Sequence, residues 1–299
     1  MSVALVTGAG GFVGGHLVAH LRASGDDVVA VDREVDVTDP RAVAAAVAAA
    51  SPEVVYHLAA LSHVGRSWEE PEAVRAVNVG GTRRVLEAVA ARAPGARVVV
   101  VSSAEVYGVT RPEDQPLAET RALAPVSPYA QSKAEAERVA LEAAVAGLDV
   151  VVVRPFNHVG PGQAPTFFVP ALATRLLAAR AAGVREVPVG DLTARRDLTD
   201  VRDVVRAYRR LALAGASGTV YNVASGVDHA MAEVAAALVE MVAPGTRLVL
   251  DPSLLRPVEV PVSRGDPTRL RAVTRWRPTI DLARSLSDVV SELDRSHQG

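Results

Sequence analysis

The chain has 299 residues, enough for one large domain or two modest ones, and 49% of them are hydrophobic, which allows a sizeable core. Its formal net charge of −2 gives no electrostatic reason to expect nucleic acid or an anionic membrane as a partner. With 0 cysteines it has no disulfide, thiolate nucleophile or Cys-based zinc site. We expect a soluble, cytoplasmic protein, because neither a long apolar run nor a basic N-terminal signal segment is seen.

Short apolar runs alternate with Ala-rich amphipathic stretches along the first half of the chain. Strands are expected at residues 3–6, 28–31, 54–58, 97–102 and 150–154, and helices at residues 14–24, 40–50, 74–91 and 127–146. The strand segments are continuous apolar runs, as in strands that are buried on both faces. The pattern therefore predicts an α/β fold of the Rossmann type, a doubly wound parallel sheet covered by helices.

The pattern loosens after residue 154, where prolines recur at positions 155, 161, 165 and 170. Regular signals return at residues 170–182, 201–214 and 219–223, and residues 248–299 are rich in Pro and Arg. We expect residues 1–155 to form a dinucleotide-binding domain to which residues 195–224 return. Residues 156–194 and 225–299 would then form a smaller, interleaved C-terminal lobe that binds the substrate.

A glycine-rich segment joins the first expected strand to the first helix. Gly8, Gly11 and Gly14 are spaced three residues apart. Glycines at such positions permit a tight turn and let backbone N–H groups approach a pyrophosphate at the helix N-terminus. We therefore expect this loop, together with Phe12 and Val13, to bind a dinucleotide.

Asp32 follows the second expected strand. A carboxylate there can accept hydrogen bonds from the adenosine ribose and would repel a 2′-phosphate, which favours NAD(H) and leaves NADP(H) possible. The neighbouring Arg33 can soften that repulsion. Asp36 and Val37 lie where the chain would pass the adenine.

Tyr129 and Lys133 are four residues apart on one face of the helix expected at 127–146. The ammonium group and the positive charge of a nicotinamide would lower the pKa of Tyr129 toward neutrality. Tyr129 could then exchange a proton with a sugar hydroxyl while hydride moves to or from the cofactor. Ser103, just beyond the strand at 97–102, is placed to hold the same substrate oxygen.

Two other groups are interpreted as ordinary surface residues. His16 and His20 lie one helical turn apart, but no third ligand accompanies them, so no metal site is expected. The arginines at 202, 206, 209 and 210 are expected on a solvated helix face.

These motifs resemble the extended short-chain dehydrogenase/reductase family over nearly the whole chain. The matching pieces are TGAGGFVG at 7–14, HLAA at 57–60, Asn78-Val79-x-Gly81-Thr82, SSAEVYG at 102–108 and SPYAQSK at 127–133. The resemblance implies an NAD(P)-dependent enzyme that binds a nucleotide-diphosphate sugar between its two lobes. Its catalytic residues would be Ser103, Glu105, Tyr129 and Lys133.

The resemblance also implies further binding residues. Besides those already named, the cofactor would contact Leu58, Ala59, Ala60, Asn78 and Pro155, and also Tyr129 and Lys133. The substrate would contact His63, Ser103, Asn157, Arg196, Arg256 and Glu259. The two arginines are expected to hold the diphosphate or the nucleotide, since guanidinium groups form paired hydrogen bonds with phosphate oxygens.

The later segments are most similar to GDP-6-deoxy-4-keto-mannose reductases and to GDP-mannose 4,6-dehydratases. They are FNHVGPGQ at 156–163, RRDLTDVRDVVRAY at 195–208, YNVASG at 221–226, LRPVEVP at 255–261 and GDPTRLRAVTRWRP at 265–278. This similarity implies reduction of a 4-keto-6-deoxy nucleotide sugar by a homodimer.

A 4,6-dehydratase or an epimerase with retained NAD is the alternative, and a non-catalytic dinucleotide sensor is a remote one. Glu105 could remove the C5 proton, which an adjacent carbonyl acidifies. Asp32 also departs from the reductases, which usually lack an acidic residue there. Ala104 favours reduction, because alanine can neither protonate nor orient a departing 6-hydroxyl group.

Overall fold

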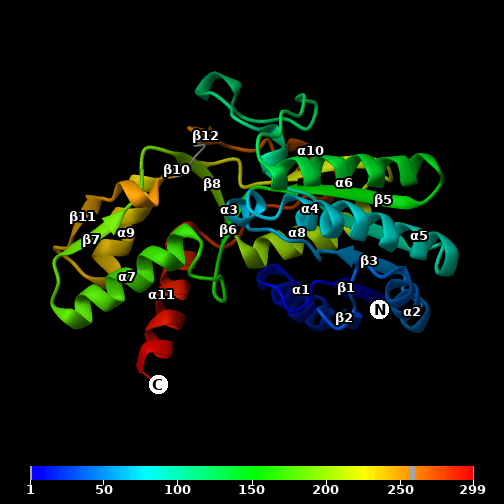
Figure 1. Cartoon of the computed structure of the whole chain (residues 1–299), viewed down its shortest axis with the longest axis horizontal. Coiled ribbons are helices and arrows are strands. Elements are labelled where there is room, and N and C mark those ends of the chain that lie inside the picture. The colour runs from blue at the N-terminus through cyan, green and yellow to red at the C-terminus, as the bar shows by residue number, and fades with distance from the viewer. Residues whose placement is uncertain (1, 256–259, 299) are drawn as a thin grey trace.

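The computed structural model describes residues 2–255 and 260–298, which form two lobes (Figure 1). The larger lobe is built on six strands, β1 (Val3–Thr7), β2 (Asp27–Val31), β3 (Val54–His57), β4 (Arg97–Val101), β5 (Asp149–Pro155) and β9 (Thr219–Val223). Their order is β2-β1-β3-β4-β5-β9, and every neighbouring pair is parallel. The Rossmann-type parallel sheet predicted from the sequence is confirmed.

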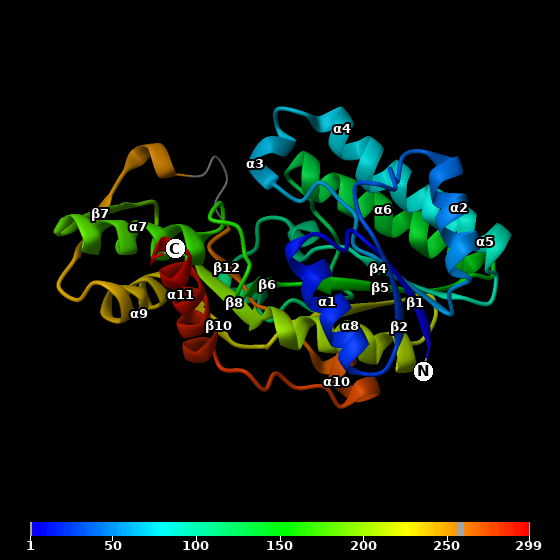
Figure 2. The same cartoon turned by 90° about the horizontal axis from the view of Figure 1, so that it is seen from below.

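Helices cover both faces of this sheet (Figure 2). One face carries α1 (Phe12–Ala23), α8 (Val201–Ala214) and α10 (Thr268–Thr274), and the other carries α2 (Pro40–Ala50), α5 (Thr82–Arg92) and α6 (Pro128–Val145). Each face has its own core, with Leu21 and Leu211 in one and Val43 and Val139 in the other. The central strands are buried from both sides, which explains their unbroken runs of valine.

The smaller lobe has its own sheets and its own apolar core. Its strands are β6 (Asn157–Val159), β7 (Glu186–Val189), β8 (Arg195–Asp200), β10 (Asp228–Ala230), β11 (Arg247–Leu250) and β12 (Val262–Ser263). Its helices are α7 (Phe168–Ala182), α9 (Met231–Val242) and α11 (Leu282–Gln298). β8 pairs with β6, β10 and β12, while β7 pairs with β11. Leu176, Leu238 and Leu286 pack together between the three helices.

The helix expected at 74–91 is instead divided into three segments. They are α4 (Pro71–Arg75), a π-helical segment η1 (Ala76–Gly81) and α5. The side chain of Asn78 in η1 bonds to both backbone groups of Leu61, with Leu61 N donating at 2.8 Å and Asn78 Nδ2 donating to Leu61 O at 3.1 Å. The π segment therefore turns a polar side chain inward, which apolar periodicity cannot predict.

Several elements of the second half were not predicted. β8 has the polar sequence RRDLTD although most of it is buried, and the 17-residue helix α11 lies in the stretch expected only to be rich in Pro and Arg. The short segments are α3 (Val64–Ser67), η2 (Ala104–Tyr107), η3 (Pro112–Asp114) and η4 (Pro252–Leu254). Within the described ranges no helix is both long and apolar enough to cross a bilayer.

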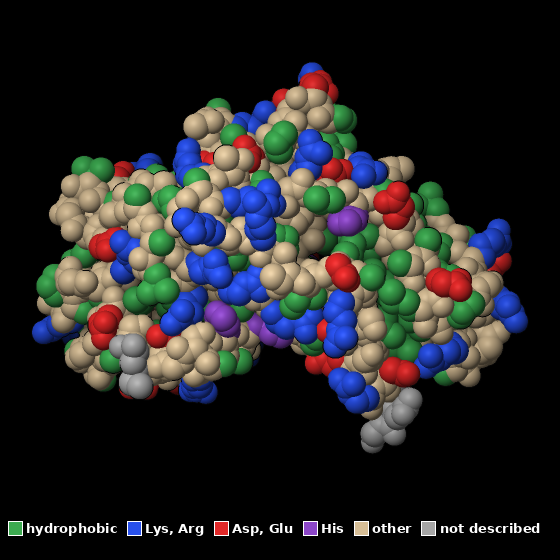
Figure 3. Space-filling model, turned by 180° about the vertical axis from the view of Figure 1, so that it is seen from behind, with side chains coloured by type: hydrophobic (Ala, Val, Ile, Leu, Met, Phe, Trp, Pro, Cys, Tyr) green, Lys and Arg blue, Asp and Glu red, His purple; other side chains and the backbone are tan. Residues whose placement is uncertain are grey.

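Basic side chains gather across the middle of the back face of the molecule (Figure 3). The arginines of α8, expected on a solvated helix face, are also engaged in tertiary contacts. The ion pairs are Arg202 with Asp200 and Asp288, Arg206 with Asp203, and Arg209 with Asp26, while Arg210 donates to Thr274 O. The pair of Arg206 and Asp203 lies within α8, and the other contacts join α8 to α10, to α11 and to the turn after α1. The four side chains stay partly or fully exposed, so the expected solvated face also carries tertiary contacts.

Candidate active site

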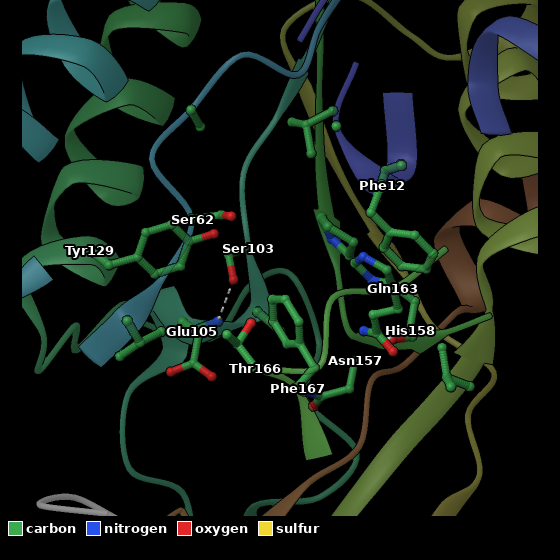
Figure 4. A pocket seen from close by; sticks show the side chains of 18 of the residues that line it. Phe12, Ser62, Ser103, Glu105, Tyr129, Asn157, His158, Gln163, Thr166 and Phe167 are labelled. Atoms are coloured by element: carbon green, nitrogen blue, oxygen red, sulfur yellow. Dashed lines mark hydrogen bonds between the residues drawn. The ribbon is translucent and has the colours of Figure 1, made fainter. Parts of the chain in front are cut away.

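A cleft of about 970 Å³ lies between the lobes, at the carboxyl ends of the parallel strands. Figure 4 looks into it. The predicted cofactor and catalytic residues that line it are Gly8, Gly11, Phe12, Val13, Gly14, Asp32, Arg33, Asp36, Val37, Leu58, Ala59, Ala60, Ser103, Glu105, Tyr129, Lys133 and Pro155. The fold therefore gathers residues from six separate sequence segments around one cavity.

The glycine-rich loop packs too closely for any side chain. Gly8 has φ +73°, and a Cβ atom there would lie 2.7 Å from the backbone N of Ala59. A Cβ atom on Gly14 would lie 2.1 Å from the carbonyl oxygen of Gly8. Helix α1 begins after Gly11 without a capping hydrogen bond from that residue. Its first N–H groups thus face the cleft in the arrangement that binds a pyrophosphate, so the residues present fit a dinucleotide.

Asp32 lies beside this loop, at the end of β2. A Cβ atom on Gly10 would come within 2.4 Å of Asp32 Oδ2, which shows how closely the carboxylate approaches the loop. Arg33 is exposed and also lines the cleft. A carboxylate at this place could accept hydrogen bonds from ribose hydroxyls.

Tyr129 and Lys133 lie in the first turns of α6, where Ser127 Oγ caps the helix by accepting a hydrogen bond from Ala130 N at 3.1 Å. The two residues are only 8% and 7% exposed. Lys133 Nζ donates a 2.8 Å hydrogen bond to Val101 O at the end of β4. Burial lowers the pKa of Lys133 to about 8, and the Glu137 carboxylate partly opposes this shift.

The expected lowering of the tyrosine pKa is not seen in the protein itself. Burial raises the pKa of Tyr129 to about 12, the Glu105 charge adds to the rise, and a hydrogen bond with the Ser103 side chain opposes it. The Lys133 ammonium is directed to a backbone carbonyl, and burial is the largest cause of the shift of the phenol. Burial therefore favours the neutral form of the Tyr129 phenol.

Ser103 and Glu105 approach the tyrosine from the opposite wall. Tyr129 and Ser103 point toward one another, and Glu105 lies close by (Figure 4). Ser103 caps the short segment η2, where its Oγ accepts a hydrogen bond from Glu105 N at 3.2 Å. The serine hydroxyl is thus oriented by the backbone of the residue whose carboxylate faces the same cavity.

Asn78 lies behind the site and does not line the cleft. It is 1% exposed, and its Nδ2 donates to Ser132 Oγ at 2.9 Å. Ser132 Oγ in turn donates to the backbone oxygen of Tyr129 at 2.7 Å. Asn78 therefore supports the helical turn that carries Tyr129. It does not lie on the cavity wall, where the expected contact with the cofactor would place it.

The predicted substrate residues have different positions. Asn157 and Arg196 line the cleft, and Arg196 Nη1 donates to Val260 O at 2.6 Å. His63 is exposed and caps α3, where its Nδ1 accepts a hydrogen bond from Arg66 N at 3.1 Å, and it is not among the cleft residues. Arg256 and Glu259 lie outside the described residues.

Sequence reasoning missed most of the wall that the smaller lobe provides. It includes His158, Gln163, Thr166, Phe167, Arg175 and Asp191. Most of these residues lie in loops or in the short strand β6, which have little local periodicity, and Arg175 lies in α7. A stronger signal was available for the catalytic helix, because Lys133 is the only lysine in the chain.

Among residues 2–255 and 260–298, no three His, Cys, Asp or Glu side chains are grouped to hold a metal ion. His16 is half-buried, and its Nε2 lies 2.8 Å from Pro161 O.

Comparisons with known proteins agree with this geometry. The NAD dependent epimerase/dehydratase family matches residues 4–224. GDP-6-deoxy-D-mannose reductase from Pseudomonas aeruginosa is 35% identical over 292 residues, covering 96% of this chain and 95% of that protein. The structure of RMD from Pseudomonas aeruginosa complexed with NADPH matches with a TM-score of 0.93 and 32% identity, over 99% of this chain and 100% of that one.

MoeE5 in complex with UDP-glucose and NAD matches with a TM-score of 0.86 and 33% identity, over 98% and 99% of the two chains. The fold and these matches define the class, an NAD(P)-dependent enzyme. The chain belongs to the NAD dependent epimerase/dehydratase family, the extended short-chain dehydrogenases/reductases. The resemblance predicted from the sequence is confirmed, and a non-catalytic dinucleotide sensor is set aside.

Proposed function

We propose that this enzyme reduces the carbonyl group of a 4-keto-6-deoxy nucleotide sugar. The observation that carries the proposal is the buried, protonated Tyr129 facing Ser103 at the end of β4. Reduction of a carbonyl needs an acid at its oxygen, and a phenol with a pKa of about 12 keeps its proton until that oxygen becomes basic. A reduced nicotinamide carries no positive charge that would remove the proton earlier.

Each catalytic side chain has a separate task in this proposal. The dinucleotide, when bound, supplies the hydride. Tyr129 donates its proton to the substrate oxygen, and Ser103 holds that oxygen by a hydrogen bond. Lys133, fixed by Val101 O, directs its remaining N–H groups toward the nicotinamide ribose. Asn78 keeps the tyrosine-bearing turn in place through Ser132.

A GDP-linked sugar is the proposed substrate. Its support is the similarity to the Pseudomonas reductase over 96% of the chain. Arg196, on the cleft wall, is proposed to hold the diphosphate, and Asn157 the sugar. The same proposal, on the resemblance alone, includes His63, Arg256 and Glu259 as substrate contacts.

Glu105 favours a second candidate, a dehydratase or an epimerase with retained NAD. Its carboxylate faces the same cavity as Tyr129 and acts on the tyrosine pKa, so it can also serve as a base toward C5. Asp32 suits an enzyme that retains NAD. Against this candidate, Ala104 also lines the cleft and offers no group to a departing hydroxyl.

Incubation with GDP-4-keto-6-deoxy-mannose and NADPH or NADH tests the choice. We expect stoichiometric oxidation of the reduced cofactor, with Tyr129→Phe lowering turnover by roughly 10²–10⁴-fold while dinucleotide binding is kept. Glu105→Gln should retain reduction. Conversion of GDP-mannose or another nucleotide sugar without net cofactor consumption, lost in Glu105→Gln, would establish the second candidate instead.

Three broader expectations are proposals of the same kind. Residues 1–155 with 195–224 are proposed as the dinucleotide-binding domain, and 156–194 with 225–299 as the substrate lobe. A homodimer is proposed, supported by a groove along α6 in which the apolar side chains of Leu123, Ala134, Leu141 and Val145 lie among the charged residues Glu137, Arg138, Glu142 and Arg154. The cytoplasmic location stays a prediction of the sequence.

A further inference from the structure

Helix α1, which begins at the dinucleotide loop, contacts the smaller lobe through residues of its first two turns. His16 Nε2 lies 2.8 Å from the carbonyl oxygen of Pro161, which is 145 residues away in the chain. Because a carbonyl oxygen only accepts hydrogen bonds, Nε2 carries the proton and donates it. A side chain that looked like an ordinary surface histidine thus joins the two lobes.

An aromatic contact accompanies this hydrogen bond. The ring of Phe12, one turn before His16, meets the His16 ring edge-on at 5.6 Å and stacks on the His158 ring of β6 at 6.0 Å. Figure 4 shows Phe12 and His158 together on one side of the cleft, with Gln163 beside them. Phe12 is the first residue of the helix that would receive the pyrophosphate, and its ring packs against the first strand of the smaller lobe.

The segment held by this contact leads directly into the substrate cavity. Gln163 Nε2 donates to His158 O at 3.0 Å and closes the turn through Pro161. The chain then continues to Thr166 and Phe167, which both line the cleft, and Phe167 is the residue from which α7 begins. We define residues 160–167 as the bridging loop.

We infer that His16 is a positioning residue that couples dinucleotide binding on α1 to the order of the bridging loop. A dinucleotide at the N-terminus of α1 immobilises Phe12 and the first helical turn. The hydrogen bond from His16 to Pro161 O then also restricts the motion of the bridging loop. A nucleotide sugar that contacts Thr166 or Phe167 then binds to a loop that is already ordered, so its binding no longer includes the entropy cost of ordering the loop. The cofactor should therefore raise the affinity for the nucleotide, on the order of tenfold.

The first test needs only the full-length protein and NADPH or NADH. Hydrogen–deuterium exchange of peptides covering residues 160–167 is measured with and without saturating dinucleotide. We expect dinucleotide to slow exchange in the wild type and in His16→Gln, whose side-chain amide can still donate to Pro161 O. In His16→Leu, dinucleotide should bind with little change in Kd but leave exchange of the loop unchanged.

His20→Leu is the matched control, because His20 lies one turn further along α1 and its surroundings are those of α8: burial lowers its pKa, and the charges of Arg209 and Arg206 lower it further. This control should keep the wild-type protection. His16→Ala takes the place of the leucine variant if that variant does not fold. Protection that persists in His16→Leu, or that is missing in the wild type, would overturn the inference. Loss of dinucleotide binding itself in His16→Leu would overturn it too, because His16 would then belong to the dinucleotide site.

The second test rests on the proposed function and measures the Kd of GDP with and without the dinucleotide. The Kd of GDP should be about tenfold higher without the dinucleotide than with it in the wild type and in His16→Gln. In His16→Leu the two Kd values should be nearly equal. If GDP, UDP and dTDP all fail to bind while loop protection still depends on His16, the proposed substrate is wrong and the coupling stands. If GDP binds with the same ratio of the two Kd values in the wild type and His16→Leu, the coupling is wrong and the substrate stands.

Discussion

Asp32 is the residue on which the choice of cofactor depends. Its carboxylate approaches the glycine loop closely, and a 2′-phosphate at the same ribose would add negative charge beside it. We expect a higher kcat/KM with NADH than with NADPH, and we expect Asp32→Ala to shift the ratio toward NADPH by about tenfold, a change of roughly 1.4 kcal/mol. Steady-state kinetics with both reduced cofactors measures this.

Asp27→Ala is the control for that experiment, because Asp27 is exposed at the opposite end of the same strand. It should leave the ratio unchanged. The similar RMD structure holds NADPH, so a strong wild-type preference for NADPH is the contrary outcome. It would show that Arg33 outweighs Asp32.

Lys133 gives a pH dependence whose sign follows from its burial. Its pKa is lowered to about 8, so the ammonium is present below that pH and is lost as the pH rises through it. Dinucleotide affinity and turnover should therefore fall above pH 8. The protonated fraction of such a group drops about tenfold for each further pH unit.

The single lysine makes this prediction directly measurable. In protein labelled with ¹³C-lysine, the Lys133 resonance should titrate near pH 8, and Glu137→Gln should lower that midpoint, because the carboxylate raises it in the wild type. Dinucleotide binding by Lys133→Met should be weaker and independent of pH. A midpoint near the ordinary value of about 10.4 would contradict the prediction.

At the scale of elements, α6 is joined to β5 by a buried ion pair. Arg154 and Glu137 have side chains 6% and 2% exposed, with Arg154 Nη2 donating to Glu137 Oε2 at 2.7 Å. Ser102 Oγ also donates to Glu137, and Arg154 Nη1 donates to the hydroxyl of Tyr107 at 3.0 Å. The charges lie next to the strand end that carries Ser103, so this network supports the catalytic wall.

Removal of one partner should leave the other charge buried and uncompensated. Glu137→Ala is expected to lower the free energy of unfolding by roughly 3–5 kcal/mol. The control is Glu142→Ala, which breaks the pair of Arg138 and Glu142 on the same helix, where the side chains are 59% and 55% exposed. That change should cost no more than about 1 kcal/mol. Equal losses in urea denaturation would show that the buried network is not a major support.

The elements themselves were predicted with uneven success. The helix expected at 40–50 has the bounds of α2, and the strands of the large sheet agree to within a residue or two. These strands are buried by helices on both faces, and this burial is visible in the local sequence as continuous apolar runs. The π segment around Asn78 and the polar strand β8 are stabilised by distant partners, so their local sequences carry no comparable signal.

At the scale of the whole molecule, the proposed homodimer depends on an exposed apolar side of α6. Val145 is 91% exposed there, beside Leu141 and Leu123. We expect light scattering after gel filtration to give twice the 31.2 kDa chain mass for the wild type, and the monomer mass for Val145→Asp. Val184→Asp, at a half-exposed valine of the smaller lobe, should remain a dimer. A monomeric wild type would refute the proposal.

The sequence by itself determined the parallel sheet, and it singled out the glycine-rich loop and Ser103, Tyr129 and Lys133 as candidate site residues, which the fold brings to one cleft. Each of these depends on a local pattern: burial on both faces, glycines that exclude a Cβ atom, or two side chains one helical turn apart. The tertiary structure decided that Tyr129 keeps its proton, because desolvation depends on everything packed around the phenol. It also decided that His16 faces Pro161 and that Asn78 braces Tyr129, since contacts between residues far apart in the chain exist only once the lobes are folded together.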